Sequence, residues 1–515
     1  MEAFLEALSG GLSLFVQPAF WAAVVVGTLY GTIAGALPGI GTTLAYALIL
    51  PFTYSLEVGT TIALLMSISV GVQYGNSIPA ILVGVPGSPA AVLSVLDGFA
   101  LHKKGETGLA LGIALVSALA GQFVSILFFA AAVIPLGALA FYFLNPELFA
   151  LYLFGIFAIV SLTGRNVLKG LMAACVGLLL AVVGLDPVSY QPRFTFDQSY
   201  LLGGLSASAA IIGFLAVSEL LRQSRQSFQW DFGSEGAIKV RFPRLREFRG
   251  TGRAMLGGTV VGTLVGAVPG AGGAPAALIA YQQAQVMSKK PELFGRGSPE
   301  GLAANESAQN AASSGELIPT LGLGIPASGS MVLLLAALTL NGFVPGPGLV
   351  TDYPELLAAV VGGLMGSTLL LCGIGWPLAK VMLKLLTVSR TLVIVGALLT
   401  VVLGVFSLSY RISDVVVCFV CGAIGYYMLR YGYSTAAASL AVVLAAGLEA
   451  SLRRGLSLFD DDVVAFVSRP IAATILILAF LFLGIGILRM VKASRADAAE
   501  AAGDEQPAPS AGAAR

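Results

Sequence analysis

Apolar stretches of about 20 residues, the length an α-helix needs to cross a membrane, follow one another along most of the chain. The uninterrupted stretches predict spans at roughly 108–142, 147–163, 166–185, 200–221, 355–379, 391–409, 413–430, 433–450 and 470–490. The alternation of apolar and polar residues that marks strands is missing. The pattern therefore predicts an all-α polytopic membrane protein of about a dozen spans.

Two further apolar regions are interrupted by glycine and proline, and they match each other about 230 residues apart. Residues 27–41 read GTLYGTIAGALPGIG and residues 258–272 read GTVVGTLVGAVPGAG. Downstream, 78–86 (IPAILVGVP) is matched by 318–326 (IPTLGLGIP), and Asp97-Gly98 by Asn341-Gly342. Glycine and proline break helices, and breaks at membrane depth are tolerated inside protein or beside a wet cavity. Paired broken segments indicate the binding site of a transporter.

Composition supports the membrane assignment. Of the 515 residues, 57% are hydrophobic and 11% are charged, with a mean hydropathy of +0.90; soluble chains carry about 25% charged residues. The net charge of +1 gives no electrostatic reason to bind nucleic acid. Cys418 and Cys421 form a CxxC, but without a second pair or a nearby histidine we interpret them as apolar packing. The N-terminus has no basic region of the kind that precedes a cleaved signal peptide.

The distribution of Lys and Arg predicts the orientation. None occurs before Lys103, whereas Arg222–Arg253 holds eight, so this central segment is expected in the cytoplasm and the N-terminus in the periplasm. The ends of the two repeats differ in charge, since 102–104 is basic and the matching 341–355 is not. Their middles differ in the opposite way, since 54–59 is not basic and the matching 289–296 is. These comparisons favour an inverted-topology repeat, with the C-terminus cytoplasmic. Arg453-Arg454 falls outside and is an exception.

The predicted organisation follows from these features. It comprises a first membrane repeat at 1–221, a basic cytoplasmic connector at 222–253, a second membrane repeat at 254–450 and an extra C-terminal span at 451–492. Residues 493–515 are rich in alanine, acidic residues and proline, and they are expected to be a disordered tail.

Polar side chains cluster beside the breaks. Asn76, Ser77 and Ser88 accompany the first, and Asn305, Glu306, Ser307, Gln309, Asn310, Ser313 and Ser314 precede the second, with a helix break expected at Gly315. Helix starts offer free N–H groups and about half a positive charge, so two facing broken helices can hold a carboxylate without a buried Lys or Arg. The backbone of Gly39, Gly41, Gly87, Gly270, Gly272 and Pro326 belongs to this candidate substrate site.

Several of these features have a plainer interpretation. Isolated GxxxG spacings serve close helix packing. Glu306 is either a coupling residue for a proton or cation, or a group near the cytoplasmic surface. Glu316 and Asp97 either lie in the site or cap helix ends, with a surface cap favoured for Asp97. The lone histidine, His102, stands beside two lysines and is interpreted as solvated, which argues against an enzyme.

The phrases resemble the TctA family, the large membrane subunit of tripartite tricarboxylate transporters. The resemblance covers most of 20–450 and rests on GALPGIG, YGNSIPAILVGVPGSPAAVLSVLDG, HKKGETGLALG, GAVPGAGG, FGRGSPEGLAANESAQNAASSGELIPTLGLGIP and NGFVPGPGL. It implies a small four-helix TctB-like membrane subunit, a TctC-like periplasmic binding protein, and ion-driven import of citrate or another carboxylate across the bacterial inner membrane.

By this resemblance the candidate ligands are Thr42, Asn76, Ser77, Ser88, Asn305, Glu306, Ser307, Asn310, Ser313 and Ser314. Three residues depart from the family pattern: Asn305 replaces a proline, Glu316 a small residue and Ala327 a glycine. These departures predict an altered second half-site and a substrate that need not be a tricarboxylate.

The expected function is therefore a symporter that works by elevator-like alternating access and has no cofactor. Carrying one charge across 100 mV is worth about 2.3 kcal/mol, so importing an anion needs a coupled cation, and no Walker sequence is present. Na⁺, held by the same polar residues with Asn305, Glu306 and Ser307 as the coupling set, or H⁺ would serve; abundant side-chain oxygens lean towards Na⁺. A channel is the alternative, although no ring of pore-lining charge is apparent.

Overall fold

A computed structural model describes residues 13–37, 39–138, 142–162, 166–186, 190–225, 241–248, 250–344, 346, 348–385 and 390–504. Pro38, half of the predicted connector (226–240 and 249) and the end of the predicted tail (505–515) lie outside the described residues. The fold is all-α, as predicted. The described strands are β1 (Gly184–Leu185) and β2 (Pro192–Arg193), which pair antiparallel, with Gly184 opposite Arg193.

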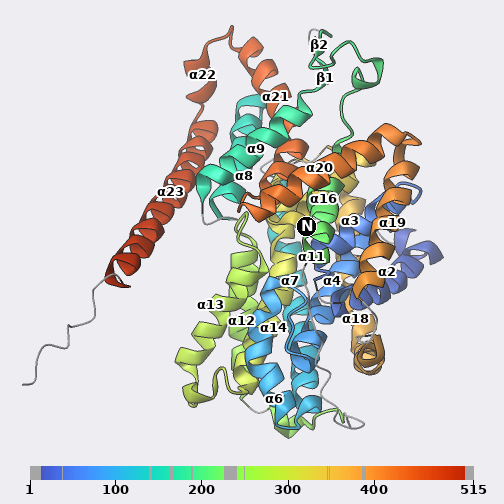
Figure 1. Cartoon of the computed structure of the whole chain (residues 1–515), viewed down its shortest axis with the longest axis vertical. Coiled ribbons are helices and arrows are strands. Elements are labelled where there is room, and N and C mark those ends of the chain that lie inside the picture. Colours follow the sequence, from blue (N-terminus) through green and yellow to red (C-terminus); the bar gives the residue numbers. More distant parts are fainter. Residues whose placement is uncertain are drawn as a thin grey trace, which may run out of the picture.

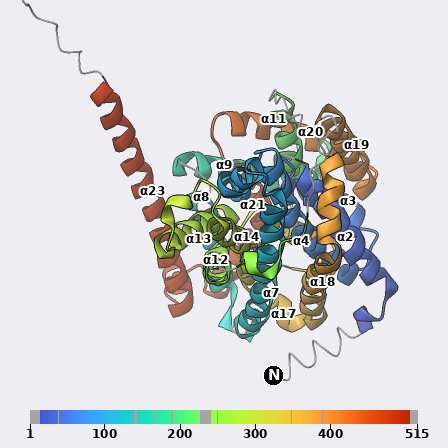
Figure 2. The same cartoon turned by 90° about the horizontal axis from the view of Figure 1, so that it is seen from below.

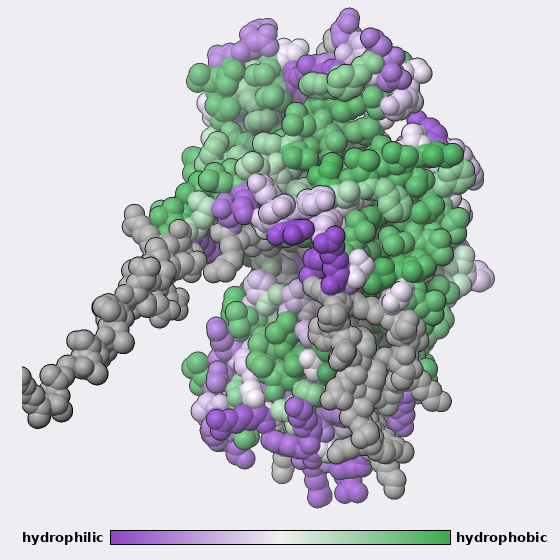
Figure 3. Space-filling view, viewed as in Figure 1, coloured by the Kyte–Doolittle hydropathy of each residue, from purple (hydrophilic) through white to green (hydrophobic). Residues whose placement is uncertain are grey.

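Among the described residues, eight helices are long and apolar enough to cross a membrane, as expected for a polytopic protein. They are α2 (Pro18–Ala36), α4 (Val58–Leu82), α7 (Thr107–Ala138), α18 (Pro354–Leu385), α19 (Arg390–Ser409), α20 (Ile412–Arg430), α21 (Thr435–Leu458) and α23 (Pro470–Asp504). Shorter apolar helices are α3 (Thr42–Thr53), α8 (Asn145–Leu162), α9 (Val167–Ala181) and α16 (Gly329–Leu340). Hydrophobic residues cover much of the upper body, and hydrophilic residues gather at its upper and lower ends (Figure 3).

The first copy of the repeated phrase makes a close helix pair, α2 against α4. A Cβ added to Gly31 would lie 2.4 Å from the Ile68 carbonyl oxygen, and one added to Gly35 would lie 2.4 Å from that of Val72. Only glycine admits such an approach of two backbones. The helical segment that follows α4 consists of η1 (Pro89–Ala91), α5 (Val92–Ser94), η2 (Val95–Phe99) and α6 (Ala100–Lys103).

The second copy makes the same kind of pair between α12 (Thr251–Gly266) and α14 (Pro299–Gly315). A Cβ at Gly262 would lie 2.3 Å from the Ala308 carbonyl oxygen, and one at Gly266 would lie 2.5 Å from that of Ala312. Between these helices runs α13 (Gly273–Met287), and after them come α15 (Leu317–Leu323) and α16. In Figure 1, α12, α13 and α14 lie in the lower part of the molecule beside α7.

A separate group of helices supports this core. Figures 1 and 2 show α23 at one edge of the molecule, where it packs on α8 with Phe482 edge-on to Phe154 at 5.4 Å. Arg453, the exception to the charge rule, pairs with Asp186 at 3.0 Å and with Glu449 at 3.2 Å. Since α23 continues to Asp504, the predicted start of the disordered tail falls within this helix.

The remaining elements connect these parts. They are η4 (Ser199–Leu201), α10 (Ala207–Ile212), η5 (Gly213–Val217), α11 (Ser218–Ser224), η6 (Leu245–Phe248), η7 (Pro291–Leu293), α17 (Leu349–Asp352) and α22 (Val463–Val467). The continuous run α10–η5–α11 packs on α20 and ends beside the first motif loop. There the Gln223 amide donates to the Gly39 carbonyl at 2.7 Å.

Candidate functional site

Four loops carry the repeated Gly/Pro phrases, and each turns on a glycine with a left-handed backbone. The φ angles are +87° at Gly39, +68° at Gly84, +81° at Gly270 and +73° at Gly324. A side chain is disfavoured at such angles, so the glycines are needed for the turns themselves. Matched positions in the two halves therefore build matched breaks.

The loops of one half lie against helix starts of the other. A Cβ added to Gly329, at the start of α16, would lie 3.3 Å from the Thr43 side chain at the start of α3. One added to Gly273, at the start of α13, would lie 3.5 Å from Ala90 in the helical segment that begins at Pro89. The structure thus brings the broken segments of the two halves together.

These four helix starts lack side-chain caps. Gly41, Ser88, Gly272 and Ser328 are the N-cap residues, and none of their side chains accepts a hydrogen bond from the first turn. Uncapped N–H groups and the helix dipoles make the region positively polarised. An anion is the ligand that such a region attracts.

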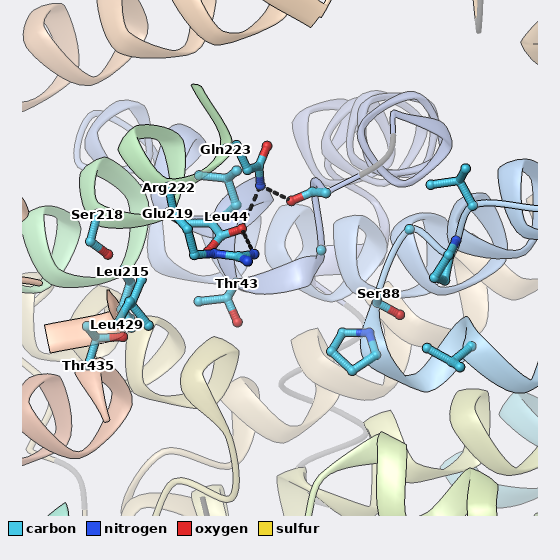
Figure 4. A pocket seen from close by; sticks show the side chains of 17 residues that line it. Thr43, Leu44, Ser88, Leu215, Ser218, Glu219, Arg222, Gln223, Leu429 and Thr435 are labelled. Carbon is cyan, nitrogen blue, oxygen red and sulfur yellow. Dashed lines mark hydrogen bonds and ion pairs between the residues drawn. The ribbon is translucent and has the colours of Figure 1, made fainter. Parts of the chain in front are cut away.

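A cavity of about 600 Å³ opens beside the first-half loops (Figure 4). Of the predicted residues, Gly39, Gly41, Gly87 and Ser88 line it. Its far side is formed by α11, where Arg222 pairs with Glu219 at 2.7 Å. The predicted site residues do not include this wall, because the predicted connector starts at Arg222, and Thr43 lines the cavity in place of the predicted Thr42.

Two polar side chains beside this cavity have no hydrogen-bond partner among the described residues. Both Nδ2 and Oδ1 of Asn76 are buried and unpaired, and so is the Ser88 hydroxyl. Asn76 lies directly behind Gly87, since a Cβ on that glycine would be 2.4 Å from Oδ1. Buried polar groups are rarely left unpaired, so these are groups with bonding capacity to spare for a ligand.

A second polar cluster joins the two halves in the interior. Glu306 of α14 accepts hydrogen bonds from Ser77 at 2.6 Å, Ser94 at 2.5 Å and Gln309 at 2.7 Å. Asn305 donates to Ser94 at 2.6 Å, and the side-chain oxygens of Asn305 and Gln309 are buried without partners among the described residues. Glu306 is fully buried, not near the surface. Carboxylate, hydroxyl and amide oxygens are the donors that a hard cation prefers.

The other residues predicted on α14 face different neighbours. Ser313 donates to Gln122 of α7 at 3.1 Å, and Ser314 accepts from the same amide at 2.7 Å. Asn310 donates to the Glu306 backbone carbonyl at 2.9 Å, and Ser307 bonds the Ala304 carbonyl at 3.2 Å. The two contacts with Gln122 join α14 to α7, and the other two lie within α14 itself.

The second half-site contains Glu316, Gly270, Gly272 and Pro326. Glu316 is 6% exposed and accepts a hydrogen bond from Ser328 at 2.6 Å. A Cβ on Gly272 would lie 3.7 Å from Oε1 of Glu316. The Gly270 N–H donates to the Ala327 carbonyl at 2.9 Å, and Pro326 is buried in the same loop. The expected break at Gly315 is slight, because Glu316 keeps right-handed helical angles and α15 follows at once.

Other residues considered from the sequence lie apart from both clusters. Asp97 is buried rather than at the surface, and it accepts from the backbone of Gly297 and Ser298 ahead of α14. His102 contacts Thr107 at 2.9 Å. Cys418 and Cys421 are free thiols in the packed interior.

Comparison with known proteins places the chain by similarity. A sequence model described as "Tripartite tricarboxylate transporter TctA family" matches residues 21–440. An "Uncharacterized 52.8 kDa protein in TAR-I ttuC' 3'region" of Agrobacterium vitis is 33% identical over 96% of this chain and 98% of its own length. An "Uncharacterized protein in TAR-II ttuC' 3'region" of Agrobacterium vitis is 34% identical over 45% of this chain and 97% of its own length. No solved structure matches.

Proposed function

This chain belongs to the tripartite tricarboxylate transporter TctA family, and we propose that it is the permease subunit that imports a carboxylate by cation symport. A multi-pass membrane protein with a non-enzymatic, transporting role agrees with that membership. The substrate, the coupling ion and the mode of movement are the parts of this proposal that go beyond the family.

One observation carries the proposal: helix starts of the first half border a cavity whose polar neighbours have spare bonding capacity, and uncapped helix starts of the second half lie against them. Asn76 and Ser88 are unpaired, Thr43 at the start of α3 lines the cavity together with Pro89, and the starts of α16 and α13 lie against Thr43 and Ala90. We infer that the substrate carboxylate binds to the N–H groups at the start of α3 and to the Asn76 amide. Arg222 is already paired with Glu219, so it does not supply the anion site.

The coupling cation is assigned to the cluster around Glu306. This carboxylate has neutral hydrogen-bond partners and no ion pair among the described residues. A buried carboxylate is stable when a cation or a proton neutralises it. We place Na⁺ or H⁺ there, with Asn305, Ser77, Ser94 and Gln309 supplying oxygens; Ser307, which faces other neighbours, is left out.

The proposed setting is the bacterial inner membrane, with the N-terminus periplasmic and the C-terminus cytoplasmic. In that orientation Arg222, which borders the cavity, lies at the cytoplasmic end of α11, and we infer that the cavity opens towards the cytoplasm. Elevator-like movement of the broken-helix hairpins against the remaining helices would expose the site outwards. A TctB-like membrane subunit and a TctC-like periplasmic binding protein complete the assembly.

Uptake by the reconstituted three-part assembly tests the proposal. We expect a radiolabelled di- or tricarboxylate to accumulate in proteoliposomes when an inward Na⁺ or H⁺ gradient is imposed, each gradient being applied alone. Accumulation should collapse when the gradient is removed. Carboxylate flux that ignores both gradients would instead identify the alternative, a channel, and no flux under any gradient would reject transport of these acids.

A further inference from the structure

Asn76 and Glu316 occupy equivalent positions in the two halves. Each precedes an Ile-Pro by two residues and follows a glycine, Gly75 or Gly315. A Cβ on Gly75 would lie 2.5 Å from the Thr32 carbonyl oxygen, and one on Gly315 would lie 2.4 Å from that of Thr263. These threonines are themselves matched in the repeated phrase. The side chains of Asn76 and Glu316 therefore start from equivalent points of the two matched helix pairs.

The chemistry at the two positions is different. Asn76 is neutral, fully buried and unpaired, and it lies behind Gly87 with the unpaired Ser88 hydroxyl next along the loop. Both residues can donate hydrogen bonds to an anion. The first half therefore has unsatisfied hydrogen-bond donors that a carboxylate can accept from.

The other half already contains a carboxylate. Glu316 reaches the uncapped starts of α13 and α16, where Oε2 accepts from Ser328 and Oε1 lies close to Gly272. Ser328 in turn contacts Ser330 at 2.9 Å. Glu316 makes no ion pair among the described residues, and its carboxyl group stands in the place where a substrate carboxylate would meet these helix starts.

We propose that the substrate binds in one direction, with a carboxylate at the Asn76 end and a hydrogen-bond donor at the Glu316 end. A carboxylate side chain attracts a hydroxyl or an ammonium group and repels a second carboxylate. The inference rests on the proposed transport function, and it narrows the substrate class to hydroxy or amino acids of low charge. Tricarboxylates without a donor are disfavoured.

Matched acids measure the donor and the charge separately. The assay compares uptake of propionate, lactate and alanine, of succinate and malate, and of tricarballylate and citrate by the reconstituted assembly. We expect the donor-bearing acid to be preferred about tenfold within each set, because one hydrogen bond to a charged group is worth at least that factor. Lactate against alanine tells a hydroxyl from an ammonium group. Uptake should fall as carboxylates are added.

The Glu316→Gln variant removes the charge and keeps the shape. In this variant the ratio of uptake between donor-bearing and donor-free acids should fall about tenfold, and the ratio of tricarballylate uptake to succinate uptake should rise. Glu300→Gln, at the other end of α14, should change neither ratio. The same binding protein is used throughout, so its own selectivity cancels when the uptake ratios of a variant are compared with those of the wild type. Unchanged ratios in an active Glu316→Gln, or a changed cation dependence with unchanged ratios, would overturn the assignment.

Asn76→Asp tests the other end of the substrate, and it remains informative if the Glu316 variant does not fold. It should lower uptake of every acid about tenfold or more and leave the donor preference in place. Normal uptake by this variant would refute the direction of binding. If the wild-type assembly carries none of these acids under any cation gradient, the proposed function itself fails.

Discussion

The two halves of this protein are built alike and equipped differently. The pairs α2–α4 and α12–α14 approach through matched glycines at matched distances from backbone oxygens. Their polar residues, however, are not matched: α14 carries Asn305, Glu306 and Gln309 in its interior, whereas the corresponding part of α4 is mostly apolar. The comparison teaches that a repeat can preserve the helix frame, which needs glycine at fixed points, while each half acquires its own chemistry.

The largest loss of stability is expected when a methyl group is added at the close glycine contacts that both helix pairs share. Gly262→Ala places a methyl group 2.3 Å from the Ala308 carbonyl oxygen, and Gly31→Ala places one 2.4 Å from that of Ile68. Each should destabilise the protein by about 1–3 kcal/mol, through forced separation of two backbones. Thermal unfolding in detergent measures this, with Gly373→Ala, which meets nothing within 4 Å, as the control. Equal losses in both halves would support the common frame; a loss in one half alone would break it.

A loss of similar size is expected at the cluster that only the second half carries. Glu306→Ala leaves the donors of Ser77, Ser94 and Gln309 without their acceptor, and a buried unsatisfied donor costs about 1–3 kcal/mol. Glu306→Gln should keep most of the stability and lose cation-driven uptake. Both properties are compared by detergent melting and by proteoliposome uptake. Cation-driven transport that persists in Glu306→Gln would remove Glu306 from the coupling site.

Asn76 and Asn310, both predicted as substrate ligands, should differ in what their removal changes. Asn76→Ala removes a side chain without partners, so we expect about a tenfold loss of uptake and little change in stability. Asn310→Ala removes the bond to the Glu306 carbonyl, so it should lower stability by about 1 kcal/mol. Melting and uptake are measured on both variants. If Asn76→Ala melts earlier and transports normally, the amide is structural.

A smaller effect is expected at the link between α11 and the first loop. Gln223→Ala removes the bond to the Gly39 carbonyl, worth about 0.5–1.5 kcal/mol, and should reduce uptake several-fold by loosening the cavity wall. Ser224→Ala, whose hydroxyl bonds only the local Leu221 carbonyl, is the control. The second half has no described equivalent of this amide, so the change also probes the asymmetry. Equal uptake by both variants would show that the wall does not depend on Gln223.

The amino-acid sequence by itself determined the helical membrane fold, the paired breaks and the family. Those features are local: about 20 apolar residues make a span, and glycine or proline breaks a helix wherever it lies. The predicted spans at 108–142 and 391–409 correspond closely to α7 and α19 for this reason.

Only the tertiary structure decided which polar residues share a site. Ser77 and Ser94 meet Glu306 across more than 200 residues of sequence, and Ser307, one residue further along, lies against Gly258 of α12. The same folding leaves Asn76 unpaired and gives Glu316 a serine partner. Hydrogen bonds between distant segments depend on how helices pack and turn about their axes, and residue spacing along one helix does not encode that.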